Sequence, residues 1–175
     1  MSLGKQIIER LRALNDAVAD AQELIQDESG SQLMVAAEPI QARLEFFDRD
    51  RYSVTLRALQ VGASAGAPSD AHSYLSATAA AIARQLSFLE EPLAVWELAG
   101  GEALAQLRSS PPLRDGDEVT YWEVALWAGE QPHARVARYR WAPGMAEREV
   151  VAYPATFALI GRMADALAAG LATGE

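Results

Sequence analysis

The sequence contains no cysteine, and this absence excludes a whole set of chemistries. A chain without cysteine forms no disulfide scaffold, offers no thiolate nucleophile and binds no metal through sulfur. Only two histidines are present, His72 and His133, and neither lies in an HExxH or HxH pattern. We therefore expect no catalytic residue, no metal site and no cofactor. We interpret both histidines as surface residues, and the sequence favours a protein that is not an enzyme.

Basic residues are also scarce, with 15 lysines and arginines against 24 acidic residues and a net charge of -9. Nucleic-acid binding depends on a basic surface that neutralises phosphates, so we expect no nucleic-acid partner. The apolar segment 155–172 carries Arg162 and Asp165 near its centre, each costing about 2.5–3.5 kcal/mol at mid-bilayer. The first residues lead directly into an amphipathic pattern, not a signal peptide. These features predict a cytoplasmic protein without a membrane partner.

The remaining composition is that of an ordinary globular protein. The chain has 175 residues, of which 50% are apolar and 22% are charged. This length supports one hydrophobic core of full size, and the composition argues against wholesale disorder. We therefore expect a single domain spanning residues 1–175.

Apolar residues at helical spacing predict three helices. The first spans Gln6 to Gln26, has an apolar stripe that continues to Ile25, and ends before Gly30. The second spans Ala71 to Glu90, is capped by Ser69 or Asp70 and ends before Pro92. In the third, Pro154 occupies the first turn and the stripe continues from Phe157 to Leu171.

Alternating polarity between these helices predicts strands. Charged or glycine-containing turns at residues 48–51 and 129–132 join neighbouring strands into hairpins. The order α-βββ-α-βββββ-α favours an α+β fold with an antiparallel sheet. The expected strands are Gln32–Ala37, Gln41–Phe47, Tyr52–Val61, Leu93–Leu98, Glu102–Arg108, Val119–Trp127, Ala134–Trp141 and Glu147–Val151.

A faint internal similarity relates residues 33–59 to residues 93–126, with a longer loop in the second copy. The two segments either share an origin or resemble each other only because both are amphipathic hairpins of similar composition. The sequence leaves both interpretations open.

The second strand region is rich in aromatic residues and arginine. If Trp122 or Trp127 shares a face with Arg138 or Arg140, the pair could form a groove for an anionic or aromatic ligand. The alternative is that the tryptophans belong to the core and the arginines pair across strands with glutamates. The glutamates available for this are Glu118, Glu123 and Glu149.

The order of elements, together with the acidity, resembles the type III secretion chaperone-like fold. The resemblance covers the first helix, the strands from Leu33 to Val61, the helix Ala71 to Glu90 and the helix after Tyr153. It includes no shared residue motif, and the region Leu93 to Ala152 is longer than the pattern has. It implies a homodimer that wraps an extended segment of a partner protein.

Three functions remain open at this stage. The first is a non-enzymatic, chaperone-like homodimer that binds a protein or peptide segment. The second is a small-molecule binder or enzyme with a pocket lined by Trp122, Trp127, Arg138 and Arg140. The third is a structural subunit whose role is set by its neighbours.

Overall fold

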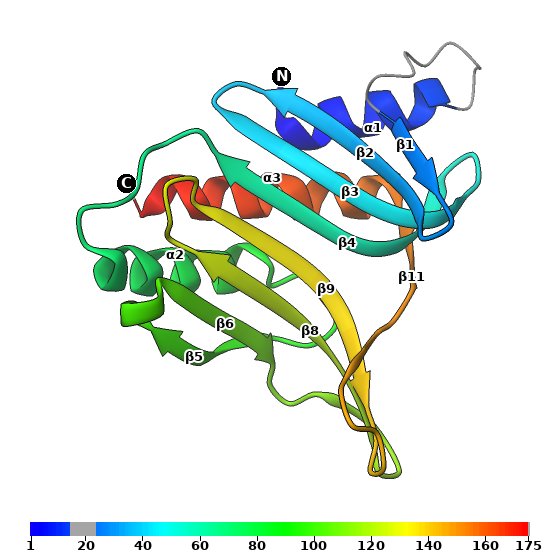
Figure 1. Ribbon diagram of the computed structural model, residues 1–175. Helices are drawn as coiled ribbons and strands as arrows, with labels where there is room; N and C mark the ends of the chain where they lie inside the picture. The colour runs from blue at the N-terminus through cyan, green and yellow to red at the C-terminus, as the bar shows by residue number, and fades with distance from the viewer. Residues whose placement is uncertain (15–23, 175) are drawn as a thin grey trace.

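In the computed structural model, three helices cover one face of an antiparallel sheet, as Figure 1 shows. The structure describes residues 1–14 and 24–174. Within them the sheet has eleven strands, and its main path runs β1-β2-β3-β4-β9-β8-β6-β5. This confirms the predicted α+β class with an antiparallel sheet.

The first half of the sheet is a meander of four consecutive strands. They are β1 (Leu24–Asp27), β2 (Gly30–Ala37), β3 (Ile40–Arg49) and β4 (Ser53–Ala63). Alternate side chains of β3, Ala42, Leu44 and Phe46, are buried beneath the helices, as their spacing predicts. The side chains between them, including Arg43 and Glu45, point to the opposite face.

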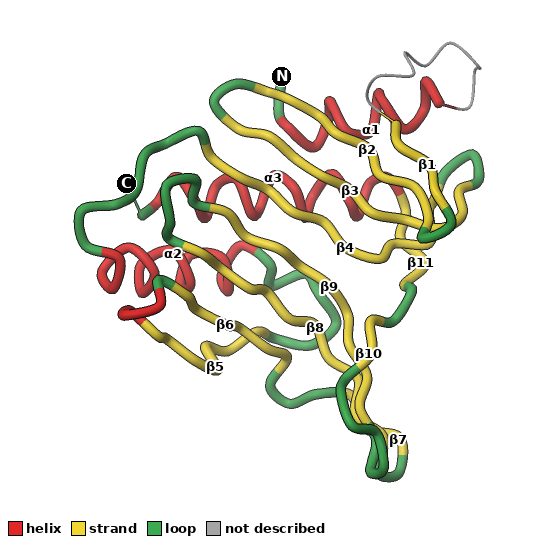
Figure 2. Tube along the Cα trace, viewed as in Figure 1, coloured by secondary structure: helices red, strands yellow, loops and turns green. Residues whose placement is uncertain are grey.

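The second half of the sheet is formed after the second helix. Its strands are β5 (Leu93–Ala99), β6 (Leu104–Ser109), β7 (Leu113–Asp115), β8 (Glu118–Trp127) and β9 (His133–Trp141), with a 3-10 turn at Gly100–Glu102. The halves join where β4 pairs with β9, for example Leu59 opposite Val136. Beyond this junction the sheet divides, because β11 (Tyr153–Thr156) adds to β4 while β10 (Glu149–Val150) adds to β9 (Figure 2).

The two halves correspond to each other strand by strand when counted outward from the junction. β4 corresponds to β9, β3 to β8, β2 to β6 and β1 to β5. Each half follows a helix, since α1 (Leu3–Ala13) precedes the first and α2 (Ala71–Gln85) the second. The internal sequence similarity instead matches β2, β3 and β4 with β5, β6 and β8. This matching is shifted by one strand from the correspondence about the junction. It therefore does not follow the arrangement of strands about the junction.

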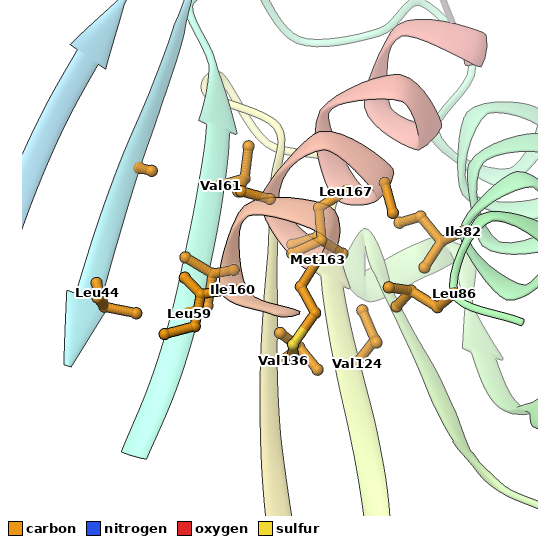
Figure 3. Packing of buried hydrophobic residues seen from close by; sticks show 14 of the residues in the cluster. Leu44, Leu59, Val61, Ile82, Leu86, Val124, Val136, Ile160, Met163 and Leu167 are labelled. Carbon is orange, nitrogen blue, oxygen red and sulfur yellow. The ribbon is translucent and has the colours of Figure 1, made fainter. Parts of the chain in front are cut away.

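The third helix, α3 (Phe157–Thr173), lies between α1 and α2 and contacts both, together with β4 and β9. Figure 3 shows Ile160, Met163 and Leu167 of α3 among side chains of the sheet and of α2. Since these residues are fully buried, α3 fills the centre of the core. Among the described residues, no helix has both the length and the apolar character needed to cross a membrane.

The first predicted helix is wrong at its C-terminal end. Residues 15–23 lie outside the described part of the chain, but Leu24–Asp27 is a strand that pairs with β2. Asp27 Oδ1 accepts a hydrogen bond of 2.7 Å from the Ser29 backbone N–H, and Gly30 has a φ of 126°. Gly30 therefore allows a two-residue hairpin turn, where the sequence predicts the end of a helix.

Three further boundaries differ from prediction. Pro154 lies in β11 opposite Thr55, and the last helix begins after Thr156, whose hydroxyl accepts a hydrogen bond from the Leu159 N–H. Proline is tolerated there because β11 is an edge strand. Helix α2 ends at Gln85, before the predicted Glu90. The short strand β7 occupies part of a predicted loop.

Candidate functional site

Among the described residues, the helices leave one face of the sheet uncovered, and we call it the open face. All three described helices lie on the other side (Figure 1). On β8 and β9, cross-strand register separates the two faces: Val124 opposite Val136 belongs to the core, whereas Trp127 opposite His133 belongs to the open face. Any site for a ligand or partner on the sheet must use the open face or an edge strand.

Two of the four predicted ligand residues lie in the interior. Trp122 is 1% exposed and Arg138, directly opposite on β9, is 4% exposed. The Arg138 guanidinium lies 5.3 Å from the Trp122 ring centroid and 5.7 Å from that of Tyr153. Its two terminal nitrogens donate to the Glu91 carboxylate at 2.9 and 3.1 Å. The expected cation–π contact exists, but its partners are internal and occupy the arginine fully.

Of the other two predicted residues, Arg140 lies two positions along β9 from Arg138, on the same face, and Trp127 lies on the opposite face. Arg140 is paired with Glu118 at 3.0 Å and with Glu149 at 3.1 Å. Trp127 projects from the open face, opposite to the face of Trp122 and Arg138. The structure therefore does not bring the four residues into one pocket. The ion pairs of Arg140 with Glu118 and Glu149 agree with the alternative interpretation, in which arginines pair with glutamates across strands.

A third glutamate of that interpretation, Glu123, is buried on the open face of β8. Arg108 Nε donates to its carboxylate at 2.8 Å, and Arg148 donates through both terminal nitrogens. Burial disfavours the charge of Arg148, but hydrogen bonds to Glu123 and Tyr121 outweigh it, and its pKa is raised above the ordinary value. The two arginines thus compensate one buried carboxylate, whose charge would be costly to bury without them.

A hollow of about 590 Å³ opens on the same face where the two halves of the sheet meet. We call it the open-face hollow. Trp127, Arg43 and His133 are among the residues that line it, together with Gly62. Its volume falls within the range of small-molecule sites. Of the predicted ligand residues, only Trp127 lines it.

The edge strand β5 is the second exposed feature. β5 pairs with β6 on one side, and no described strand pairs with its other side. Its Val95 is 49% exposed and Trp96 is 66% exposed. A register shift between Val95 and Glu97 places Trp96 in a bulge, where the guanidinium of Arg108 lies 5.1 Å from its ring centroid. Two adjacent apolar side chains thus lie on an unpaired edge.

Ionisable groups elsewhere in the described residues do not form a reactive cluster. No three His, Asp or Glu side chains gather there in a way that could hold a metal ion. The pKa of Tyr153 is raised above 10.0, first by burial and then by the nearby Glu90. It packs edge-on against Trp122, with ring centroids 4.9 Å apart. Its perturbation follows from its place in the core.

Sequence reasoning missed Arg43, Gly62 and His133 as site residues. The alternation of β3 places Arg43 away from the core, which was visible in the sequence. His133 is opposite Trp127 in the predicted hairpin, so their contact could also have been anticipated. Arg43 lies near Trp127 and His133 only because β4 pairs with β9, and no local sequence pattern indicates that pairing.

Comparison with known proteins does not identify a family for this chain. No protein-family model, no curated protein and no solved structure matches the chain. The function must therefore be argued from the residues themselves.

Proposed function

We propose that this protein is a non-enzymatic binding module that holds an extended segment of a partner protein as an added strand along β5. The observation that supports this best is the pair Val95 and Trp96, adjacent and exposed on an edge strand that no described strand covers. Backbone groups of such an edge are free to pair with another chain, and exposed side chains give the pairing affinity.

The composition of β5 supports a docking role for this edge. Proteins commonly protect edge strands with charge, yet Glu97 is the only charged residue between Leu93 and Ala99. The bulge at Trp96 interrupts the ladder at one position, so an added strand would pair with the residues on either side of it. Trp96 is also of the residue type most often found to dominate binding energy at interfaces.

The opposite edge of the sheet provides a matched comparison. Within the part of the chain that the structure describes, β1 pairs with β2 alone and carries Ile25, which is 54% exposed, close to the value for Val95. However, β1 has four residues and ends at Asp27, whereas β5 has seven. A longer edge offers more backbone pairs to an added strand, so we assign binding to β5.

Substitution of each edge tests the assignment. We expect a fluorescein-labelled, carboxymethylated unfolded protein to bind the wild-type chain, as measured by fluorescence anisotropy. Val95→Lys and Trp96→Lys should each weaken binding at least about tenfold, because each removes an apolar contact and adds a charge to the edge. Ile25→Lys in β1 is the control and should bind like the wild type. Equal losses at both edges, or no binding by the wild type, would refute the proposal.

The homodimer implied by the chaperone resemblance stays a prediction. Within one chain, the β4–β9 junction already joins two corresponding halves into a continuous sheet. A second copy is therefore not needed to complete the sheet, and a dimer would have to use another surface. Strand addition along β5 requires only one chain.

A further inference from the structure

We propose that the open-face hollow is a binding site for a planar aromatic ligand that carries a single carboxylate. The site lies on β3, β4, β8 and β9, whereas the proposed peptide site uses the edge of β5. The inference therefore goes beyond the proposed function, and its residues can be changed without touching Val95 or Trp96.

The floor of the hollow is created by Gly62. In one row across the sheet, Gln41 of β3 lies opposite Gly62 of β4, which lies opposite His133 of β9 and then Trp127 of β8. Gly62 contributes no side chain to this row, so the surface is hollow between the side chains of Gln41 and His133. A Cβ placed on Gly62 would contact His133 Cβ at 3.5 Å, an ordinary van der Waals distance. The backbone there could accept a Cβ, which would lie between Gln41 and His133 at the floor of the hollow.

One wall of the hollow is aromatic. The rings of Trp127 and His133 are stacked, with centroids 4.7 Å apart and planes inclined by 19°. The His133 ring is oriented by a 2.9 Å contact between Nδ1 and the carbonyl oxygen of Gln131. Both side chains are only half-buried and both line the hollow, so a planar ring can pack against this wall.

Arg43 supplies the charge in the wall opposite this pair. It is half-buried, and within the described residues no carboxylate lies within ion-pair distance of it. Its Nε is buried and has no hydrogen-bond partner. A carboxylate in the hollow would be the only ion-pair partner of the Arg43 guanidinium among the described residues, and it could accept two parallel hydrogen bonds from it.

A second buried arginine donor lies in the adjacent row. Arg43 is opposite Gln60, and Gln60 is opposite Arg135. Arg135 donates to Glu45 through one terminal nitrogen at 3.2 Å, while its other terminal nitrogen is buried without a partner. Arg135 is paired with Glu45 and does not line the hollow, so the unpaired positive charge at the site is that of Arg43.

The rim restricts how much negative charge the ligand can carry. Glu102 and Glu130 line the hollow and are exposed. Against the one arginine of the lining, these carboxylates repel a polyanion, so a ligand with one negative charge is favoured over a nucleotide or polyphosphate. A ligand whose aromatic ring packs against Trp127 and whose single carboxylate pairs with Arg43 would fit both the aromatic and the charged parts of the lining.

Titration with small probes tests this site in the full-length protein. The probes are indole-3-acetate and 2-naphthoate, their uncharged amides, and adenosine triphosphate, followed by calorimetry and by chemical shifts of the His133 ring. We expect both carboxylates to bind, with the amides at least tenfold weaker and the nucleotide weaker still. Equal binding of acid and amide, tighter binding of the nucleotide, or no binding of the carboxylates at millimolar concentration would overturn the proposal.

Two variants and one control locate the binding. Gly62→Val should abolish binding by filling the floor, and Arg43→Gln should weaken carboxylate binding at least tenfold while leaving amide binding unchanged. Arg114→Gln, on an exposed residue of β7 that does not line the hollow, should bind like the wild type. If Gly62→Val fails to fold, Arg43→Gln decides the matter alone. Unchanged carboxylate binding in Arg43→Gln would refute the assignment.

Discussion

At the scale of single residues, the most consequential side chains are buried charges with full sets of partners. Arg138 lies where the sheet divides, enclosed by the rings of Trp122 and Tyr153 and held by both oxygens of Glu91. A buried ion pair contributes little over an apolar pair of similar shape, but the loss of one partner is expensive. The region therefore depends on the pair being intact.

Removing Glu91 should expose this dependence. We expect Glu91→Ala to lower the free energy of unfolding by about 3 kcal/mol, because the buried Arg138 keeps its charge and loses its partner. The double variant Glu91→Ala/Arg138→Met should recover most of the loss. Urea denaturation measures both, with Glu149→Ala as the control: Glu149 pairs with Arg140 at the surface, and the change there should be within about 0.5 kcal/mol. A double variant no more stable than the single one would contradict this account.

Tyr153 next to the pair should titrate late. Burial and the charge of Glu90 raise its pKa above 10.0 in the folded protein. The folded state then holds its proton more tightly than the unfolded state does. This stabilisation is fully present below pH 10 and is lost as the pH rises through the folded pKa. Absorbance of tyrosinate follows the ionisation, and Tyr153→Phe should remove a component that titrates above pH 10. An unchanged titration curve in the variant would contradict the assignment.

At the scale of elements, α1 is held against α3 by a close backbone approach. A Cβ on Gly4 would lie 2.2 Å from the Gly161 carbonyl oxygen. The Gly4 N–H also donates to Asp165 Oδ1 of α3 at 2.7 Å. The contact satisfies a free N–H in the first turn of α1 and requires glycine at that position.

An added methyl group at this crossing should separate the helices. We expect Gly4→Ala to destabilise the protein by about 1–3 kcal/mol, since the new atom meets rigid backbone. Gly66→Ala is the matched control, because a Cβ there meets nothing within 4 Å. Its stability should be equal to or slightly above that of the wild type. Thermal denaturation followed by circular dichroism compares the two, and equal midpoints would refute the role of the contact.

The elements that sequence predicts well are those in which a local pattern and the tertiary structure agree. Alternation in β3 and the hairpin between β8 and β9 follow directly from one buried face and one exposed face. The sequence predicts helix for Leu24–Asp27 because Ile25 continues the apolar stripe of the first helix by coincidence. The turn before Gly30 instead makes these residues a strand.

The candidate site shows a second limit of sequence reasoning. Trp122 and Trp127 are five residues apart on one strand and therefore point to opposite faces. The sequence could not say which face the helices would cover. The hollow also joins β3 to β8 through two intervening strands, and this neighbourhood exists only after β4 pairs with β9.

At the scale of the whole molecule, one hydrophobic cluster spans both halves of the sheet and all three helices. Leu59 of the first half and Val136 of the second pair directly beneath α3. Since neither half has a separate core, we expect the halves to unfold together. The four tryptophans all lie between residues 96 and 141, so their fluorescence reports on the second half alone.

Unfolding followed by two signals tests this cooperativity. In urea, tryptophan fluorescence and far-ultraviolet circular dichroism should give coincident transitions with a single midpoint. Circular dichroism senses the helices and strands of both halves, and fluorescence senses only the second. A fluorescence transition displaced from the circular dichroism transition would show that the halves unfold independently.

The joining of two corresponding halves in one polypeptide also permits asymmetry. In an assembly of identical subunits, any residue near the twofold axis faces its own copy, so an arginine would meet an arginine. Here the junction between β4 and β9 places Arg43 from one half and Trp127 from the other in the same hollow. Because each half has its own sequence, the cation and the aromatic ring can be supplied by different residues on the two sides of the junction. An asymmetric ligand can therefore bind at a junction that would be symmetric between identical subunits.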